Sequence, residues 1–428
     1  MADRPTYITT PIYYVNGLPH IGHAYTTIAA DVYARWERVR GRQVFFLTGT
    51  DEHGQKVMQT AQKRSMSPKA HCDDMVAHWV AMWERLNIKH DRFIRTTDAD
   101  HEAVVTAVMQ TLFDKGLIYK RDYEGWYYVS DEIFVTDKDV EAGKYDRSKL
   151  QRISETNYWF VMSEYQQRLI DHIEANPGFI RPNSRRNEVL GFLRKPLGDL
   201  CISRPRSRME WGIELPFDSD YVTYVWFDAL LNYLSGIGYH PDPALAGDWE
   251  QWWPATFQLL GKDILTTHSV YWSTMLMAME VPLAECLYAH GWWTSADGDK
   301  MSKSQGNAID IALLEREFGA DPCRYFFLRE KSMGADGGFS YAGFLTRYNA
   351  DLANDLGNLA HRGLSMTDKW LGGVVPASGD LEPIDVELRR TAANAIRGFR
   401  EHMDELAFSR ALESLWLMVK AANKYIEQ

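Results

Sequence analysis

The N-terminal segment changes from a strand-like to a helix-like pattern of apolar positions. Residues 7–15 are rich in β-branched and aromatic side chains, which is typical of a β-strand. Asn, Gly and Pro at positions 16–19 interrupt this run, because these residue types favour turns. From His20 the pattern is helical, with apolar residues four apart at Ile28, Val32 and Trp36. The pattern predicts a strand, a tight turn and a helix.

Further apolar runs predict the remaining strands of a parallel sheet. Strand-like runs occur at residues 43–49, 257–261 and 284–290, and helical patterns occur at 67–87, 99–115 and 268–279. Strand–helix alternation of this kind predicts a doubly wound α/β sheet. Polar residues 50–54 follow one of these strands at its carboxyl end, which is the edge where open parallel sheets bind ligands.

Between the two groups of strands the pattern changes, which predicts an inserted domain that splits the sheet. The elements expected are a strand at 119–135, a loop at 137–152, a helix at 157–176, and a strand at 221–228 that leads into a helix from Ala229. Residues 341–428 have a helical pattern throughout. The predicted fold is a split doubly wound parallel (Rossmann-like) sheet with an inserted α+β domain and a C-terminal all-helical domain.

Charge limits the ways in which the chain could contact nucleic acid. The 428 residues include 47 Lys and Arg against 58 Asp and Glu, a formal charge of −11. RNA contacts would therefore have to come from local patches. The basic stretch from Arg181 to Arg208 is one candidate, although such a run is as readily a solvated face.

Cysteine spacing and hydropathy exclude several classes of protein. The four cysteines, Cys72, Cys201, Cys286 and Cys323, are widely separated, so the sequence has neither a disulfide framework nor the paired spacing of a thiolate zinc site. The N-terminus is polar and no apolar run reaches membrane-spanning length. We expect a cytoplasmic protein with reduced thiols that does not contact membranes.

The start of the first helix is a candidate phosphate site. His20 and His23 flank Gly22 where unpaired backbone N–H groups and the helix dipole favour an anion. Gly22 leaves room for a ligand close to the backbone. Taken alone, the two histidines could equally be a surface pair or half of a metal site.

A polar loop at residues 299–307 is the second candidate. It carries Lys300, Met301 and Lys303 together with two serines and a glycine, and by itself it could be a solvated turn. The histidine-bearing strand–helix and this lysine loop together resemble the two signatures of class I aminoacyl-tRNA synthetases. That resemblance implies that His20, His23, Lys300 and Lys303 are catalytic.

Residues outside the two signatures make the chain similar to the methionyl-tRNA synthetase family. The resemblance implies a methionine site formed by Ile12, Tyr14, Asp51, Trp226, Ala229, Tyr233, Ile264, His268 and Trp272. Aromatic walls and one polar contact suit a polarisable thioether. Without the resemblance, Trp226, Tyr233 and Trp272 could be core aromatics, and Asp51 could cap a strand end.

The same resemblance implies the rest of the substrate set. It places ATP, with Mg²⁺, against His20, Gly22, His23, Gly261, Asp263, His290, Gly291, Lys300, Met301 and Lys303. It implies that methionine's carboxylate attacks the α-phosphorus, and that the methionyl group of the adenylate is then transferred to the terminal ribose of tRNA(Met). Asn358 and Arg362 match anticodon-binding residues of the family.

Two departures from the family pattern lead to further expectations. Residues 128–131 are Tyr-Val-Ser-Asp where many relatives have paired cysteines, so we expect no zinc. The C-terminal helix stops before the Pro-Trp segment found in relatives, so the helical domain is expected to be incomplete. We expect a monomer with a Rossmann-like catalytic domain at 1–114 and 221–292, a connective domain at 115–220, a lysine-loop region at 293–345 and an anticodon-binding domain at 346–428.

Three other functions remain open from the sequence. Another class I synthetase is one, although the insertion is short for an editing domain and no zinc-thiolate pocket for cysteine is present. A small-molecule nucleotidyltransferase could share the histidine motif, but it would not need the long insertion and the helical C-terminal region. A non-catalytic tRNA-binding module would have no reason to keep both histidines and both lysines.

Overall fold

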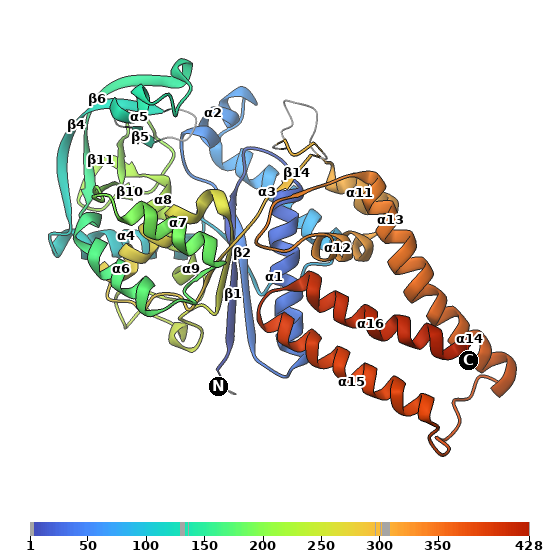
Figure 1. The fold of residues 1–428 in the computed structure, drawn as a ribbon. Coiled ribbons are helices and arrows are strands. Elements are labelled where there is room, and N and C mark those ends of the chain that lie inside the picture. The colour runs from blue at the N-terminus through green and yellow to red at the C-terminus, as the bar shows by residue number, and fades with distance from the viewer. Residues whose placement is uncertain are drawn as a thin grey trace.

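The structure is a computed structural model that describes residues 4–128, 133–135, 137–295, 297–299, 301 and 309–427. Figure 1 shows a central sheet, the inserted region on one side of it, and an arm of C-terminal helices on the other. Among the described helices, none is both long and apolar enough to cross a membrane.

The central sheet is parallel and has the order β3-β2-β1-β12-β13-β7 within the described chain. Its strands are β1 (Thr6–Tyr14), β2 (Val44–Asp51), β3 (Arg92–Arg95), β7 (Ile180–Arg181), β12 (Phe257–Gly261) and β13 (Leu287–His290). The two halves meet where β1 pairs with β12, with Ile8 opposite Phe257. The predicted split parallel sheet is confirmed.

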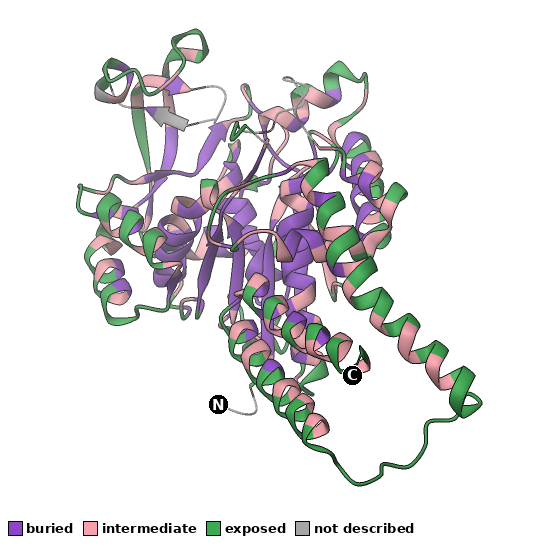
Figure 2. Cartoon of the chain, turned by 45° about the vertical axis from the view of Figure 1, so that its right-hand side comes forward, coloured by how far each residue is buried: buried purple, intermediate pink, exposed green. Residues whose placement is uncertain are grey.

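Both faces of the sheet are covered, as a doubly wound fold requires. Successive side chains of a strand point to opposite faces. Tyr7 accordingly lies in one hydrophobic core and Ile8 in the other, and Leu47 and Phe46 divide in the same way. Figure 2 shows that burial is concentrated in the sheet and its covering helices, whereas the C-terminal helices are largely exposed or half-buried.

Both halves of the chain supply helices around the sheet. The first half supplies α1 (Ile21–Val39), α2 (Gln55–Lys63), α3 (Pro68–Arg85) and α4 (Ala99–Asp114). The second half supplies α8 (Val225–Leu230), α9 (Asn232–Ser235), the π-helix η5 (Thr267–Trp272) and α10 (Ser273–Ala278), with 3₁₀ turns η3 (Trp249–Gln251) and η4 (Lys262–Ile264). The start of α3 follows from sequence, because Ser67 caps it and Pro68 suits its first turn.

The inserted region contains two antiparallel sheets, ordered β5-β4-β6-β8 and β10-β11-β9. Its strands are β4 (Ile118–Tyr128), β5 (Ile133–Val135), β6 (Leu150–Phe160), β8 (Leu200–Cys201), β9 (Ser203–Pro205), β10 (Glu214–Leu215) and β11 (Asp218–Thr223). Its helices are α5 (Asp137–Glu141), α6 (Gln166–Ala175), α7 (Asn183–Leu193) and the short η1 (Arg147–Lys149) and η2 (Met162–Tyr165).

Three sequence-based expectations for this region are wrong. The helix predicted at 157–176 begins only at Gln166, because residues 157–160 complete β6 and pair with β4. Cross-strand pairing of the aromatic Tyr158, Trp159 and Phe160 outweighs the helical spacing. The loop predicted at 137–152 contains α5 and η1. The strand predicted at 221–228 ends at Thr223, and α8 follows because tertiary contacts override the β-propensity of Trp226 and Phe227.

Two observations bear on the predicted domain boundaries, which remain a prediction. Strand β7 comes from the predicted insertion, yet it pairs with β13 at the edge of the central sheet. The boundary at 345–346 falls inside helix α13 (Tyr341–Arg347). Both segments therefore connect the regions they were expected to separate.

The C-terminal region follows β13 and is largely helical, as predicted for residues 341–428. Its elements are β14 (Trp293–Thr294), α11 (Ile311–Phe318), α12 (Ala320–Arg329), β15 (Gly337–Gly338), α13, the π-helix η7 (Tyr348–Gly357), α14 (Asn358–Leu371), α15 (Pro383–Asp404) and α16 (Phe408–Glu427). Helix α1 connects this region to the sheet, because Trp36 packs edge-on against Phe399 and Arg40 pairs with Asp404.

Candidate active site

Helix α1 begins at the predicted histidine pair. His20 is the N-cap: its Nδ1 accepts a hydrogen bond from the backbone N–H of Gly22, at 3.1 Å. His23 reciprocates, with its Nδ1 3.3 Å from the backbone nitrogen of His20. The first turn has no acidic residue, so the positive end of the helix dipole is not neutralised by its own sequence.

This capping arrangement sets which nitrogen of each ring can donate. Because both Nδ1 atoms accept backbone N–H groups, the neutral rings carry their protons on Nε2. The rings of His20 and His23 stack with centroids 3.5 Å apart, and Tyr13 and Trp79 lie against His23 at 4.7 and 4.8 Å. A Cβ at Gly22 would lie 3.0 Å from Cε1 of His20, so the glycine makes room for the capping ring itself.

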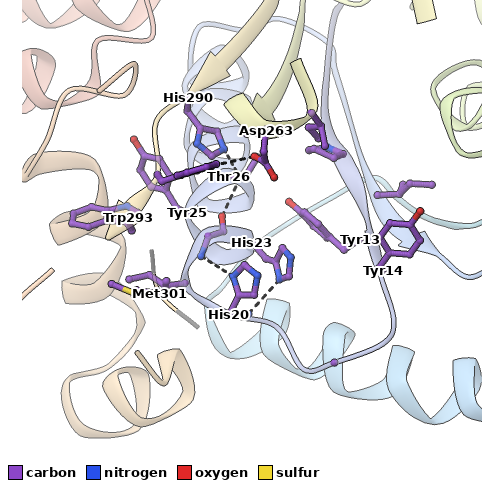
Figure 3. A pocket seen from close by; sticks show the side chains of 18 of the residues that line it. Tyr13, Tyr14, His20, His23, Tyr25, Thr26, Asp263, His290, Trp293 and Met301 are labelled. Carbon is purple, nitrogen blue, oxygen red and sulfur yellow. Dashed lines mark hydrogen bonds between the residues drawn. The ribbon is translucent and has the colours of Figure 1, made fainter. Parts of the chain in front are cut away.

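A cavity of about 520 Å³ opens at this helix start (Figure 3). The predicted ATP residues within the described chain all line it: His20, Gly22, His23, Gly261, Asp263, His290, Gly291 and Met301. Three predicted methionine residues, Ile12, Tyr14 and Ile264, line it as well. Lys300 and Lys303 lie outside the described residues.

His290 is held as a neutral ring on the wall of the cavity. Its Nδ1 lies 2.9 Å from the carbonyl oxygen of Gly291, which can only accept, so Nδ1 carries the proton. Its Nε2 then accepts from the hydroxyl of Thr26, at 2.6 Å. Burial lowers the pKa of His290 to about 4, which is consistent with this neutral state.

Asp263 is an exposed carboxylate at the end of β12. Its Oδ1 accepts a hydrogen bond from the indole nitrogen of Trp292, at 3.1 Å. A Cβ at Gly261 would lie 2.5 Å from the same oxygen, so only glycine allows Asp263 to adopt this position. Gly291 is equally constrained, because its Cβ would lie 2.2 Å from the backbone of Ala335.

Tyr233, His268 and Trp272 form a buried cluster next to the cavity. The hydroxyl of Tyr233 is 2.7 Å from Nε2 of His268, and the Nδ1 of His268 is 2.9 Å from the carbonyl oxygen of Ile264. The ring of Trp272 lies 5.8 Å from that of Tyr233. Burial lowers the pKa of His268 to about 4, so the neutral ring accepts the hydroxyl proton of Tyr233. Ile264 joins this cluster to the cavity, since it lines the cavity and packs against the same core.

The other predicted methionine residues lie on neighbouring elements and do not line the cavity. Asp51 is buried at the end of β2, opposite Tyr14 of β1. Ala229 is buried on α8, and Trp226 on the same helix is half-buried against the core that contains Tyr233. The structure thus brings part of the predicted methionine set to the cavity and the rest to the elements beside it.

Several residues around the cavity were not predicted from the sequence. Thr26 holds His290, and Tyr25 lies edge-on to the same ring. Lys331 lies over the ring of Tyr25, with its Nζ 2.9 Å from the carbonyl oxygen of Ala335, and burial lowers its pKa to about 7. The spacing of Thr26 from Gly22 and His23 places it on the same helix face and could have indicated it. No local signal indicates Lys331.

The predicted anticodon residues lie in the C-terminal arm. Asn358 and Arg362 are one turn apart on α14, which projects away from the sheet (Figure 1). The guanidinium of Arg362 lies 3.3 Å from Glu427 of α16.

Metal coordination by the protein alone has no support among the described side chains. Within that part of the chain, no group of three or more His, Cys, Asp or Glu residues could hold an ion. Whether the protein contains zinc stays a prediction, because positions 129–132 lie outside the described residues.

Similarity to known proteins agrees with this site. Residues 6–152 and 144–364 match the family described as tRNA synthetases class I (M). Methionine–tRNA ligase from Oceanobacillus iheyensis is 44% identical over 441 residues, which cover 100% of this chain and 65% of that protein. The ligase from Caldanaerobacter subterraneus subsp. tengcongensis is 45% identical over 424 residues, 99% of this chain and 66% of that protein.

Among solved structures, Mycobacterium tuberculosis methionyl-tRNA synthetase in complex with methionyl-adenylate matches with a TM-score of 0.93 and 42% identity. That match covers 99% of this chain and 84% of the other. The chain spans just under two thirds of the length of the two ligases named above. Since the family match extends over most of the sequence, the chain belongs to the class I tRNA synthetases (M).

Proposed function

We propose that this chain activates L-methionine with ATP to form methionyl-adenylate and then transfers the methionyl group to the 3′-terminal adenosine of tRNA(Met). The observation that carries the proposal is the cavity, into which the histidine-bearing start of α1 and the side chains of Ile12, Tyr14 and Ile264 all open. Donors suited to phosphate and walls suited to a thioether therefore share one space. The named methionine–tRNA ligases, each more than 40% identical, support the same assignment.

The first step needs no catalytic base. A carboxylate oxygen of methionine forms a bond to the α-phosphorus, and the bond from that phosphorus to the bridging oxygen breaks to release pyrophosphate. The substrate supplies the nucleophile, so the protein contributes positioning and charge stabilisation. The Nε2–H groups of His20 and His23 donate to phosphate oxygens as negative charge builds.

The lysines act on the leaving pyrophosphate. Lys300 and Lys303 neutralise its charge, and Lys303 is the one assigned to the transition state, on the strength of the sequence motif. ATP enters as its Mg²⁺ complex, because the phosphate oxygens are the ligands that this ion prefers. Asp263 and Gly261 contact the ribose of ATP, and His290 and Gly291 lie along the adenine side of the nucleotide.

Methionine is recognised by aromatic walls and one carboxylate. The thioether lies against the Tyr233 and Trp272 side of the core, whose aromatic rings suit a polarisable sulfur. Asp51 pairs with the α-amino group. In the second step, a hydroxyl of the terminal ribose attacks the carbonyl carbon and AMP leaves, while Asn358 and Arg362 contact the anticodon. The protein acts as a cytoplasmic monomer.

The test is amino-acid-dependent pyrophosphate exchange with all twenty amino acids. Exchange that depends on methionine, and far less on any other amino acid, is the expected result. Exchange driven by leucine, valine, isoleucine or cysteine would reassign the chain to another class I synthetase. Absence of exchange with every amino acid would leave nucleotidyl transfer to a different small molecule, or tRNA binding alone.

A further inference from the structure

A buried network of two histidines and one carboxylate lies outside the cavity. Nδ1 of His53 is 2.7 Å from one carboxylate oxygen of Asp228, and Nε2 of His101 is 2.8 Å from the other. The second ring nitrogen of His101 lies 2.7 Å from the hydroxyl of Ser235. All four side chains are buried, and none of them is in the proposed chemistry.

His53 belongs to the segment that follows β2, and this segment is fixed on its other side. The buried carboxylate of Glu52 accepts hydrogen bonds from Arg95 and Thr97, at 2.7 and 2.6 Å. Asp51 is the residue immediately before Glu52. The position of Asp51 is therefore set by Glu52 toward β3 and by His53 toward α8.

Helix α8 needs contacts with the rest of the protein to hold its position. It has only six residues and its N-terminus has no side-chain cap, so it is not stable by itself. Gly54 approaches its first residue so closely that a Cβ would lie 2.7 Å from Cγ2 of Val225, and its φ of +112° suits glycine. Asp228 lies in the middle of α8, between Trp226 and Ala229.

The electrostatics favour an ion pair between His53 and Asp228. Burial by itself raises the pKa of Asp228, but the adjacent His53 and the hydrogen bond from His101 outweigh burial and lower the pKa to about 2. Burial by itself lowers the pKa of His53, but Asp228, Glu102 and Glu52 outweigh it and raise the pKa. A buried carboxylate with charged or hydrogen-bonding partners on both oxygens holds a defined geometry.

We propose that His53 and Asp228 are positioning residues that hold Asp51 at a fixed distance from Trp226 and Ala229, and so determine the affinity for methionine. This inference rests on the proposed function. The segment after β2 presents the group for the α-amino end of the substrate, and α8 presents walls for its side chain. The His53–Asp228 contact joins this segment to α8. Its loss lets the segment and the helix separate, while the ATP side of the cavity stays in place.

The experiment compares His53→Gln with Ser235→Ala in methionine-dependent pyrophosphate exchange. Ser235→Ala removes a buried hydrogen bond at the other end of the same network but leaves the His53–Asp228 contact intact. We expect His53→Gln to raise the KM for methionine by about tenfold or more, since small misplacements cost up to about a hundredfold. The KM for ATP should stay the same, and Ser235→Ala should change neither KM.

A second measurement does not depend on how well His53→Gln folds. Three carboxylates face His53, on Asp228, Glu102 and Glu52, and the Glu102 carboxylate is partly exposed, 3.9 Å from Nε2. Glu102→Gln removes one of the three and lowers the pKa of His53. In the unmodified protein, the KM for methionine should rise as increasing pH removes the proton from His53. In Glu102→Gln we expect this rise to begin at a lower pH.

The outcomes separate the two proposals. Activity with an unchanged methionine KM in His53→Gln, or identical pH profiles with and without the Glu102 carboxylate, would refute the positioning role alone. An equal rise of methionine KM in Ser235→Ala would also refute it, because the effect would then follow from any disturbance of the network. Absence of methionine-dependent exchange in the unmodified protein would refute the proposed function and this inference together.

Discussion

His20 and His23 are arranged as mutual caps at the start of α1, where each imidazole accepts a backbone N–H through its Nδ1 atom. One pair of side chains thereby serves two purposes. It satisfies backbone donors that a helix start leaves unpaired, and it fixes Nε2 as the nitrogen that carries the proton of each neutral ring. Stability and catalysis are combined in the same residues, and substitutions can separate them.

His20→Asn should separate these two roles. Asparagine is among the preferred N-cap residues, so the variant should keep the thermal unfolding midpoint of the unmodified protein. Its rate of pyrophosphate exchange should fall by about two orders of magnitude, the scale for removing one preorganised donor. His20→Ala is the matched control and should lose activity together with about 1 kcal/mol of stability. Normal exchange by His20→Asn would contradict the assigned phosphate contact.

Lys303→Ala tests the lysine loop, for which the expectation rests on charge and sequence motif. Removing a positive charge that stabilises the leaving pyrophosphate should slow adenylate formation by about two orders of magnitude or more. Methionine affinity, measured by equilibrium dialysis, should be unchanged. Weakened methionine binding with a normal rate of adenylate formation would show that Lys303 acts in substrate binding instead.

Gly261→Ala should weaken ATP binding through Asp263. The new methyl group would lie 2.5 Å from Oδ1 of Asp263 and must displace that carboxylate. Because Asp263 is proposed to contact the ribose, the KM for ATP should rise by about tenfold, the cost of roughly 1.4 kcal/mol. Gly191→Ala, on α7 with no atom within 4 Å of its Cβ and not among the cavity-lining residues, is the control and should be silent. A raised methionine KM with an unchanged ATP KM would refute the ribose assignment.

Local patterns predicted the parts of the site that depend on neighbouring residues. The strand, turn and helix around His20 have short-range signals, and β12 was predicted with its observed bounds, Phe257–Gly261. The helix predicted for residues 157–160 is wrong because these residues pair with β4, which lies about forty residues earlier in the chain. The strand predicted where α8 lies is wrong for a similar reason. Its residues have strand propensity, but contacts with residues distant in sequence hold them in a helix.

The arrangement of side chains in the site depends on contacts between residues far apart in sequence. Thr26 and His290 are 264 positions apart, and His53 and Asp228 are 175 apart. No periodicity or spacing rule relates such pairs. The resemblance to a family indicated which residues matter, but the capping geometry, the tautomers and the His53–Asp228 contact required the structure.

The stability of the His53–Asp228 pair should depend on pH. The pKa of His53 is raised above its ordinary value of 6.5, so protonation stabilises the folded state. That contribution is complete below the unfolded pKa and is lost as pH rises through the folded one. Asp228, with a pKa of about 2, stays ionised throughout this range.

The measurement is the free energy of unfolding of the unmodified protein and of His53→Gln at about pH 6 and pH 9. The difference between the two proteins should be larger at the lower pH. Ser235→Ala is the control, and its difference from the unmodified protein should not vary with pH. An equal difference at both pH values for His53→Gln would show that the pKa of His53 is the same in the folded and the unfolded protein.

Arg362→Ala should reduce tRNA charging without affecting methionine activation. Arg362 lies on α14 in the C-terminal arm, one turn beyond Asn358, and it is not among the described residues that line the cavity. If it contacts the anticodon, its loss should cost about 1–3 kcal/mol, which is roughly fivefold to 150-fold in kcat/KM for tRNA(Met). Methionine-dependent pyrophosphate exchange should stay normal, since that reaction needs no tRNA.

Arg390→Ala is the matched control, because Arg390 is an exposed arginine on α15 that pairs with Glu387 at close range. Its removal therefore changes the charge of the same arm by the same amount. Charging by the Arg390→Ala variant should be nearly unchanged. An equal loss in both variants would mean that the arm attracts tRNA only through its overall charge, and a loss of exchange in Arg362→Ala would mean that the substitution acts on the fold.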